Sequence, residues 1–360
     1  MIGLQVRTLK LKIAWAAVLI AFLPLGARAQ SALYAAANPV PDQSVQARAK
    51  ALRQDLATVF VKVSGNPDAA SSSALAPALA QASQLVSEYR YQEVPPTEGG
   101  GLALWASFDA DKVNAALGAA GEPIWGRSRP RVIAWVLAPA GMVGDDSTNP
   151  LSRSMQKRAL KRGLPLVLPL LDIADRKAVS GFDIQSFYLP ALKQASQRYG
   201  AQAMLIGTIQ QSGKQVSSHW RLVLGDNTND FAVPAPSPAS AAAAAVGMAT
   251  TELAGQFARL SGSGKPGLIA LTVANVDRLQ AETRVRRAVA DVQGVKQFQL
   301  VRVTGDALHF VVTYAGAPKD FARDLSLSGI LTQSNSAPVA TSASFAATTR
   351  RAALRFRYTP

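Results

Sequence analysis

The sequence predicts a mixed α/β (α+β) fold divided into three small units. Apolar residues recur at three- and four-residue steps in several segments, which is typical of amphipathic helices, and these segments alternate with apolar runs of strand length. Stretches rich in Pro, Ala, Ser and Gly at residues 233–245 and 261–267 predict a long loop and a linker. The predicted units are residues 30–130, residues 131–260 and residues 268–333, followed by a flexible low-complexity segment at 334–349 and a terminal strand at 350–360.

The first unit is predicted to be α+β. The apolar residues from Val45 to Val63 form one helix face, and Gly65 is a natural helix stop. Residues 102–108 predict one of two strands around a Gly-rich turn, and Asp109 is placed to cap the helix that follows.

The second unit has the predicted element order βαβαβββα. Residues 132–138 and 203–209 are apolar runs typical of buried parallel strands. Residues 164–171 predict a further buried strand, at a sheet edge because the run contains two prolines. Ser152 is placed to cap the helix that ends at Arg162.

The third unit has the order βαββα, which predicts a small ferredoxin-like, split βαβ domain. Residues 268–273 predict its first strand, Asn275 is placed to cap the next helix, and residues 295–304 and 307–314 predict a hairpin. Apolar and Arg side chains then alternate up to Tyr358, so the chain end is expected to return as a strand.

The first 29 residues predict a signal peptide. Three basic residues precede an apolar run at residues 13–25, which is shorter than the roughly 20 residues needed to span a bilayer. Small side chains then predict cleavage between Ala29 and Gln30. Since no later apolar run has spanning length, we expect a soluble exported protein without a transmembrane segment. The lack of Cys excludes disulfides, thiol catalysis and Cys-ligated metals.

Basic residues outnumber acidic ones, 38 to 23, which gives a formal net charge of +15. Four basic residues would leave with the signal peptide, and the remaining surplus belongs to the second and third units. Nucleic acid is a poor candidate partner for two reasons. The protein is expected outside the cytoplasm, and no aromatic stacking residues are interleaved with these basic residues.

The most suggestive chemistry is a cationic helix formed by Arg153, Lys157, Arg158, Lys161 and Arg162. The ordinary explanation is a solvated face that keeps the protein soluble. The functional alternative is contact with anionic lipid headgroups, a cell-wall polymer or an acidic protein. Two further basic clusters contain Arg284, Arg286 and Arg287 and, at the chain end, Arg350, Arg351, Arg355 and Arg357.

Two apparent catalytic motifs do not have the context that their chemistry needs. Residues 262–267 match G-x-G-x-x-G but follow a predicted helix and precede a strand, the reverse of a dinucleotide loop, so a linker is the better interpretation. Ser154 and Lys157 match S-x-x-K, yet the partner motifs of serine hydrolases with a lysine base are missing from the sequence.

No cofactor or metal site is predicted. His219 and His309 fall on half-exposed strand positions in different units, so they form no evident metal pair. Asp172 is the best remaining carboxylate, because it follows a buried strand where α/β active sites often lie. An end-of-strand cap is its ordinary explanation, and a hydrolase that uses Asp172 with carboxylates from elsewhere stays open as an alternative.

Several blocks of the chain are similar to the proteobacterial "domain of unknown function 2066" family. They are Leu104-Trp105, Phe108-Asp109, Pro123-Ile124-Trp125-Gly126, Arg129-Pro130, Gly163-Leu164-Pro165, Leu168 to Asp172, and Tyr199-Gly200-Ala201. The resemblance implies an exported protein of Gram-negative bacteria and carries no activity. The second unit also resembles, in element order, the amino-terminal domain of the Tol-system propeller protein and envelope lipoproteins that activate wall synthases, which is likeness of fold alone.

Together these observations predict a periplasmic, non-enzymatic protein that interacts with or assists other parts of the cell envelope. Trp125, Gly126, Arg129 and Pro130 lie between the first and second units, where we expect them to fix the interface or to contact a partner. The alternatives are an adaptor that binds anionic lipid or wall polymer through the basic residues, and the hydrolase near Asp172.

Overall fold

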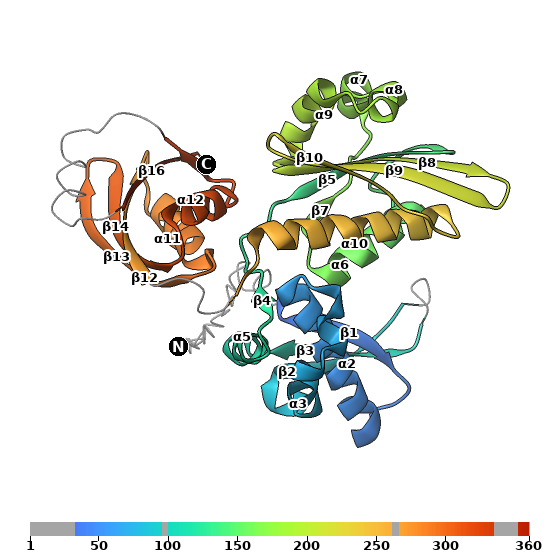
Figure 1. Cartoon of the computed structure of the whole chain (residues 1–360), viewed down its shortest axis with the longest axis horizontal. Coiled ribbons are helices and arrows are strands. Elements are labelled where there is room, and N and C mark those ends of the chain that lie inside the picture. Colours follow the sequence, from blue (N-terminus) through green and yellow to red (C-terminus); the bar gives the residue numbers. More distant parts are fainter. Residues whose placement is uncertain (1–32, 96–99, 261–265, 335–351, 360) are drawn as a thin grey trace, which may run out of the picture.

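A computed structural model of the chain describes residues 33–95, 100–260, 266–334 and 352–359 (Figure 1). Three main sheets with packed helices make up these residues, so the predicted mixed α/β class is confirmed. The predicted signal peptide and most of the linker and low-complexity segment lie outside the described residues. Among the residues that are described, no helix is long and apolar enough to cross a membrane.

The first unit is an antiparallel sheet of order β1-β3-β2 with a long helix, α2, across one face. Ser44 accepts a hydrogen bond from the N–H of Ala47 at the start of α2, and Gly65 ends the helix with a left-handed φ of 73°. The elements are β1 (Ala35–Val40), α2 (Val45–Ser64), η1 (Pro67–Ser71), η2 (Ser73–Leu75), α3 (Ala76–Ala80), α4 (Ala82–Leu85), β2 (Val86–Glu93), β3 (Leu102–Phe108) and α5 (Ala110–Ala119).

The second unit is a sheet of order β10-β9-β8-β5-β6, with β7 also paired to β5. Helices α6 and α10 cover one face, and the short helices α7, α8 and α9 cover the other (Figure 1). The elements are β5 (Val132–Ala138), β6 (Gly141–Val143), α6 (Pro150–Arg162), β7 (Leu166–Val167), α7 (Ile173–Ala178), α8 (Gly181–Gln185), α9 (Leu189–Ser196), η4 (Gln197–Tyr199), β8 (Ala203–Ser212), β9 (Gln215–Leu224), β10 (Asn227–Ala232) and α10 (Pro238–Phe257).

The strand predicted at residues 164–171 is wrong in length, because only the two residues of β7 pair with β5. The prolines on either side lack the N–H that a longer ladder would use, and Leu171 then turns the chain with a φ of 53°. The predicted element order also missed the short strand β6 and two of the three short helices, α7 and α8.

The predicted cap of α6 is wrong as well. The helix begins at Pro150, and Asn149 accepts a hydrogen bond from the N–H of Leu151 at 2.8 Å. Pro at the first helical position removes a donor that would have no partner there, so the helix starts before Ser152. Ser152 lies inside the helix and donates its hydroxyl hydrogen to the Gly144 carbonyl at 2.7 Å.

The third unit is a sheet of order β13-β14-β12-β16-β15, in which β12 and β13 are parallel with β14 between them. This is the predicted split βαβ arrangement. The chain end does return as a strand, β16, and it lies inside the sheet between β12 and the short β15. The elements are β12 (Pro266–Ala274), α11 (Leu279–Asp291), β13 (Val295–Thr304), β14 (Ala307–Ala315), α12 (Pro318–Ser326), β15 (Leu331–Gln333) and β16 (Ala352–Tyr358).

The prediction that Asn275 caps α11 is wrong. Asn275 has a φ of 64°, and its backbone N–H donates to the Asp306 carboxylate at 3.2 Å, so it belongs to a turn before the helix. The residue that precedes the first helical position is Arg278. Asn tolerates the left-handed region better than most residues, which explains its place in this turn.

A two-stranded antiparallel ribbon joins the two ends of the second unit. Strand β4 (Pro123–Ile124), which leads into that unit, pairs with β11 (Arg259–Leu260), which leads out of it. The entry and exit of the chain are therefore held side by side next to the first unit. The connecting residues after β4 become the centre of the junction between the units.

Helix α2 buries two ionisable side chains of opposite sign. Asp55 is fully buried and accepts a hydrogen bond from Asn38 at 2.6 Å, and Lys62 donates to the Ala35 carbonyl at 2.8 Å. Burial raises the pKa of Asp55 to about 7, because the hydrogen bond from Asn38 and the charge of Lys62 only partly offset the loss of water. Burial likewise lowers the pKa of Lys62 to about 8.

We expect Asp55→Asn to have a more favourable effect on the free energy of unfolding, relative to wild type, at pH 8 than at pH 5. The wild-type carboxyl takes up a proton more readily when folded than when unfolded, so its contribution to the free energy of unfolding falls as the pH rises from about 4 to 7. The stability difference between variant and wild type should grow by about 2 kcal/mol from pH 5 to pH 8, measured by urea unfolding at both values.

The matched control is Asp42→Asn. Asp42 is exposed and its pKa is lowered by hydrogen bonds from Ser44, so its carboxylate is ionised in both states at pH 5 and at pH 8. Its effect on stability should therefore be the same at the two values. An effect of Asp55→Asn that does not change with pH would show that Asp55 titrates like an exposed carboxyl.

Candidate functional site

The four junction residues meet where the first and second units join. Trp125, Gly126, Arg129 and Pro130 are all buried in the segment between β4 and β5. The backbone N–H of Trp125 donates to the carbonyl of Val63 in the last turn of α2. The structure therefore holds Trp125 and Arg129 against the first unit, while contact with a partner through the four residues stays a prediction.

Arg129 is the centre of this junction. Its Nε donates to the Gly126 carbonyl at 3.0 Å, Nη1 to Gly163 at 2.9 Å, and Nη2 to Lys62 at 2.7 Å and to Trp125 at 2.6 Å. The guanidinium also lies over the Trp125 ring, 4.2 Å from its centroid. The Arg129 side chain thus bonds to the first unit through Lys62 and to the second unit through Gly163.

The charge of Arg129 is balanced by carbonyl oxygens. Two of its acceptors, Lys62 and Gly163, lie at the carboxyl-terminal ends of α2 and α6, where a helix presents unpaired carbonyls and a partial negative charge. No carboxylate of the described residues lies within ion-pair distance of Arg129. Burial lowers the pKa of Arg129, and the guanidinium still carries its charge near neutral pH.

Arg162 makes a second bond across the same junction. Its Nη2 donates to the Gly65 carbonyl at 2.8 Å and to the Thr251 hydroxyl at 2.9 Å, which links α6 to the end of α2 and to α10. A Cβ on Gly65 would lie 2.2 Å from the Cβ of Ala254, so α2 ends in close contact with α10. Arg162 is only 4% exposed, so its predicted place on an exposed cationic face is wrong.

The junction segment also reaches the third unit. A Cβ on Gly126 would lie 2.8 Å from Gln293, which follows α11. Ser128 donates to the Asp291 carbonyl at 3.3 Å, and Arg127 lies 3.6 Å from the Asp291 carboxylate. The six residues from Trp125 to Pro130 therefore contact all three units.

Four of the five predicted basic residues of α6 do form an exposed cationic surface. Arg153, Lys157, Arg158 and Lys161, called here the α6 cationic face, are exposed, and they take part in no ion pair within the described part of the chain. Helix α6 contains no acidic residue. Within the helix, therefore, no negative charge offsets these four cations.

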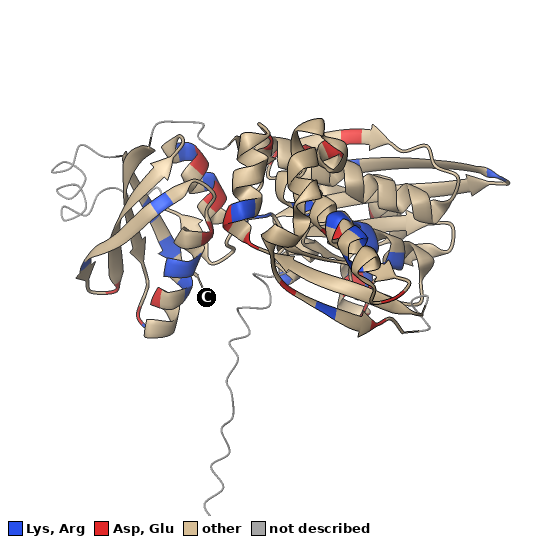
Figure 2. Cartoon of the chain, turned by 90° about the horizontal axis from the view of Figure 1, so that it is seen from below, with Lys and Arg blue, Asp and Glu red and all other residues tan. Residues whose placement is uncertain are grey.

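The other two predicted basic clusters differ from it. On α11, Arg284 donates to the Tyr358 hydroxyl at 3.3 Å, and Arg286 pairs with Glu282 at 2.8 Å. Arg350 and Arg351, at the chain end, lie outside the described residues. In Figure 2 the third unit, at the left, carries blue and red segments along its helices, so positive and negative side chains share this surface. The α6 cationic face has no such acidic neighbours on its own helix.

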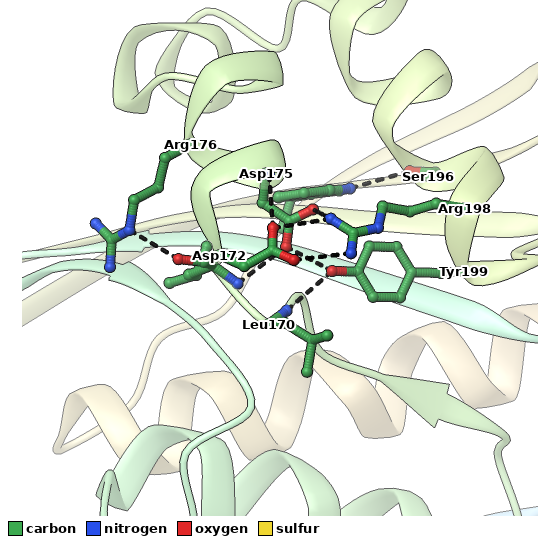
Figure 3. A network of polar contacts seen from close by, with 9 residues as sticks. Leu170, Asp172, Asp175, Arg176, Ser196, Arg198 and Tyr199 are labelled. Carbon is green, nitrogen blue, oxygen red and sulfur yellow. Dashed lines mark hydrogen bonds and ion pairs between the residues drawn. The ribbon is translucent and has the colours of Figure 1, made fainter.

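Asp172 lies in a closed polar network (Figure 3). Arg198 donates to both of its carboxylate oxygens, at 2.9 and 2.8 Å, and also to Asp175 at 2.9 Å. The Tyr199 hydroxyl donates to Asp175, whose side chain is fully buried, and accepts from the backbone N–H of Leu170 at 2.9 Å. The network ties α7, η4 and the chain after β7 together.

This geometry gives Asp172 a structural role. It caps α7 by accepting from the N–H of Asp175, and the bonds from Arg198 hold the pKa of Asp172 well below its usual range. A general acid needs a pKa raised toward neutral, so the hydrolase alternative gains no support here. The pairing with Arg198 has no signal in the sequence, because this residue is 26 positions from Asp172. Only the packing of η4 places its guanidinium next to the Asp172 carboxylate.

The remaining candidate residues form no catalytic or metal-binding group. Ser154 donates to the Leu151 and Ala239 carbonyls, so its hydroxyl supports the contact between α6 and α10. His219 is exposed on β9, whereas His309 is 4% exposed on β14, so its predicted half-exposed position is wrong. The described residues contain no group of three or more His, Asp or Glu side chains suited to a metal ion.

We expect Arg129→Lys to lower the free energy of unfolding by about 3 kcal/mol. An ammonium group has three donors and no planar fork, so carbonyls at the ends of α2 and α6 would remain buried without partners. Urea unfolding followed by tryptophan fluorescence measures the change. The control is Arg127→Lys, two residues away and exposed, with an expected change within about 0.5 kcal/mol. Equal effects of the two substitutions would contradict the role given to Arg129.

The comparisons with known proteins concern the first unit. Residues 27–126 match the family described as "Domain of unknown function (DUF8605)". This range includes the blocks from Leu104 to Gly126 that resemble the "domain of unknown function 2066" family, whereas the blocks from Arg129 onward lie beyond it. No curated protein matches the chain. The chain is therefore similar to an uncharacterised domain over its first unit, and membership of the 2066 family stays a prediction.

Proposed function

We propose that this chain is a non-catalytic, exported protein of the cell envelope that binds an anionic membrane surface through the α6 cationic face. The observation that carries the proposal is the concentration of four exposed, unpaired cations on a helix without acidic residues. Ordinary surface charges are mixed in sign, as they are on α11 and α12 of the third unit.

The arrangement of α6 supports this proposal. Arg153, Lys157 and Lys161 follow each other at four-residue steps, on the side of the helix opposite the buried Met155 and Ala159. Because they share one side, they can approach a charged plane together. Their attraction to anionic lipid is about 1 kcal/mol for each basic residue near the surface, so the expected binding is reversible and depends strongly on salt.

Exposed apolar side chains favour a membrane over a soluble polyanion. Leu160 is 66% exposed on the same side of α6 as Lys157, and Met248 of the neighbouring α10 is 44% exposed. A cationic helix with apolar side chains among its charges matches the interfacial helices that lie on bilayers. A wall polymer would use the charges but would gain nothing from Leu160.

The experiment measures cosedimentation of the mature chain, from Gln30 onward, with vesicles. Phosphatidylglycerol vesicles should bind the chain, and phosphatidylcholine vesicles should not. The triple variant Arg153→Glu, Lys157→Glu, Lys161→Glu should lose at least tenfold in affinity for the anionic vesicles, and wild-type binding should weaken strongly between 50 and 200 mM salt, about a threefold-to-tenfold loss or more.

The matched control reverses three cations of another helix, of which Lys50 and Arg53 are exposed and Arg48 is half-buried beside the Tyr89 ring. Arg48→Glu, Lys50→Glu, Arg53→Glu on α2 changes the net charge by the same amount, so it separates a local surface from the overall charge. Its affinity should stay within threefold of wild type. Equal losses in the two triple variants, or binding that is insensitive to salt, would contradict the proposal, and binding to a soluble polyanion without vesicle binding would replace lipid by polymer.

A further inference from the structure

Strand β10 forms an open edge of the six-stranded sheet. It pairs with β9 on one side, and within the described residues no strand lies on its other side. The N–H of Val233 donates to the Ser218 carbonyl, and bonded positions alternate along an antiparallel ladder. The backbone groups of Thr228, Asp230 and Ala232 therefore point to the open edge, where another strand could pair with them.

A hollow of about 350 Å³ lies beside this edge, on the side of the sheet that carries α7, α8 and α9. Asp230 and Ala232 of β10 point to this side, because they alternate with Phe231, which packs against the core under α6 and α10. The residues that line the hollow, called here the β10 hollow, are Phe187, His219, Trp220, Asp230, Phe231 and Ala232.

Phe187 is held over the β10 hollow in an uncommon backbone conformation. Its φ is 54°, in the left-handed region that bulky side chains rarely adopt. The Arg221 guanidinium lies 4.9 Å from the centroid of the Phe187 ring and is itself fixed by two bonds of 2.6 Å to Asp230. Such positions persist where the surroundings impose them, often at binding sites.

The edge lacks the features that usually prevent another strand from pairing. Proteins protect exposed edges with proline, lysine or inward-pointing charges. Residues 227–232 contain neither proline nor lysine, and the one charge, on Asp230, is neutralised by Arg221. On the segment from α8 to α9 that carries Phe187, the apolar side chains of Phe182 and Tyr188 are 74% and 53% exposed.

We infer that β10 is the docking site for an extended peptide segment of a partner protein, which pairs along the edge and places an aromatic side chain in the β10 hollow. A strand satisfies both features at once, because its backbone bonds to the open edge and its alternate side chains reach the hollow. The partner residue beside Asp230 and Ala232 stacks on Phe187 and lies within reach of the His219 imidazole. This site is on the other side of the sheet from the α6 cationic face and does not depend on it.

The experiment selects ligands from a library of displayed heptapeptides on the intact mature chain. The enriched peptides should alternate apolar and polar residues around one aromatic residue, and a synthetic copy labelled with fluorescein gives the affinity by anisotropy. Ala232→Pro removes an outward N–H without breaking a bond to β9, and it should weaken binding at least tenfold. Phe187→Ala should also weaken binding at least tenfold.

The control is Asn229→Ala. The backbone of Asn229 bonds to β9 and its side chain points to the opposite side of the sheet, so this variant should stay within twofold of wild type. Circular dichroism melting checks that each variant is folded, and the alanine variants keep the test valid if the proline variant does not fold. Failure to enrich any peptide, or enriched peptides that bind Phe187→Ala and Ala232→Pro as tightly as wild type, would overturn the inference.

Discussion

The arrangement of the units depends on one buried positive charge. The Arg129 guanidinium is removed from water without a carboxylate beside it, and such a charge is tolerated only if every donor finds an acceptor in good geometry. The acceptors are carbonyl oxygens at the ends of α2 and α6 and in the segment that carries Arg129 itself. Because helix ends are rigid and their carbonyls point along the axis, the two helices can satisfy Arg129 only when they meet end to end.

The same constraint separates two kinds of basic residue on α6. Lys161 and Arg162 fall in its last turn, where the helix dipole favours cations, and Arg162 completes the junction with the first unit. Lys157 and Arg153 lie one and two turns earlier, where neither the dipole nor a packing contact accounts for them. The basic composition of α6 thus has a structural cause at its carboxyl-terminal end, and the proposed membrane contact concerns the exposed basic residues along the rest of the helix.

The sequence predicted what depends on local pattern and missed what depends on distant partners. The limits of α2 and β3 follow from periodicity and from Ser44, Gly65 and the strand alternation. The burial of Arg162 had a local signal, since it follows Met155 and Ala159 by seven and three residues and so shares their face. The pairing of Asp172 with Arg198 and the left-handed Phe187 had none, because both arise only when α7, α8 and η4 pack on the sheet.

The two proposed surfaces use the two sides of one sheet. Along β9 and β10, Trp220 and Phe231 contribute to the core beneath α6 and α10, and their neighbours His219 and Asp230 line the hollow on the opposite side. The alternation of strand side chains therefore separates the surfaces by the thickness of the sheet and one helix layer. A membrane bound to α6 leaves the open edge of β10 accessible, so the second unit can hold a lipid surface and a peptide strand at the same time, as an accessory protein between a membrane and a partner requires.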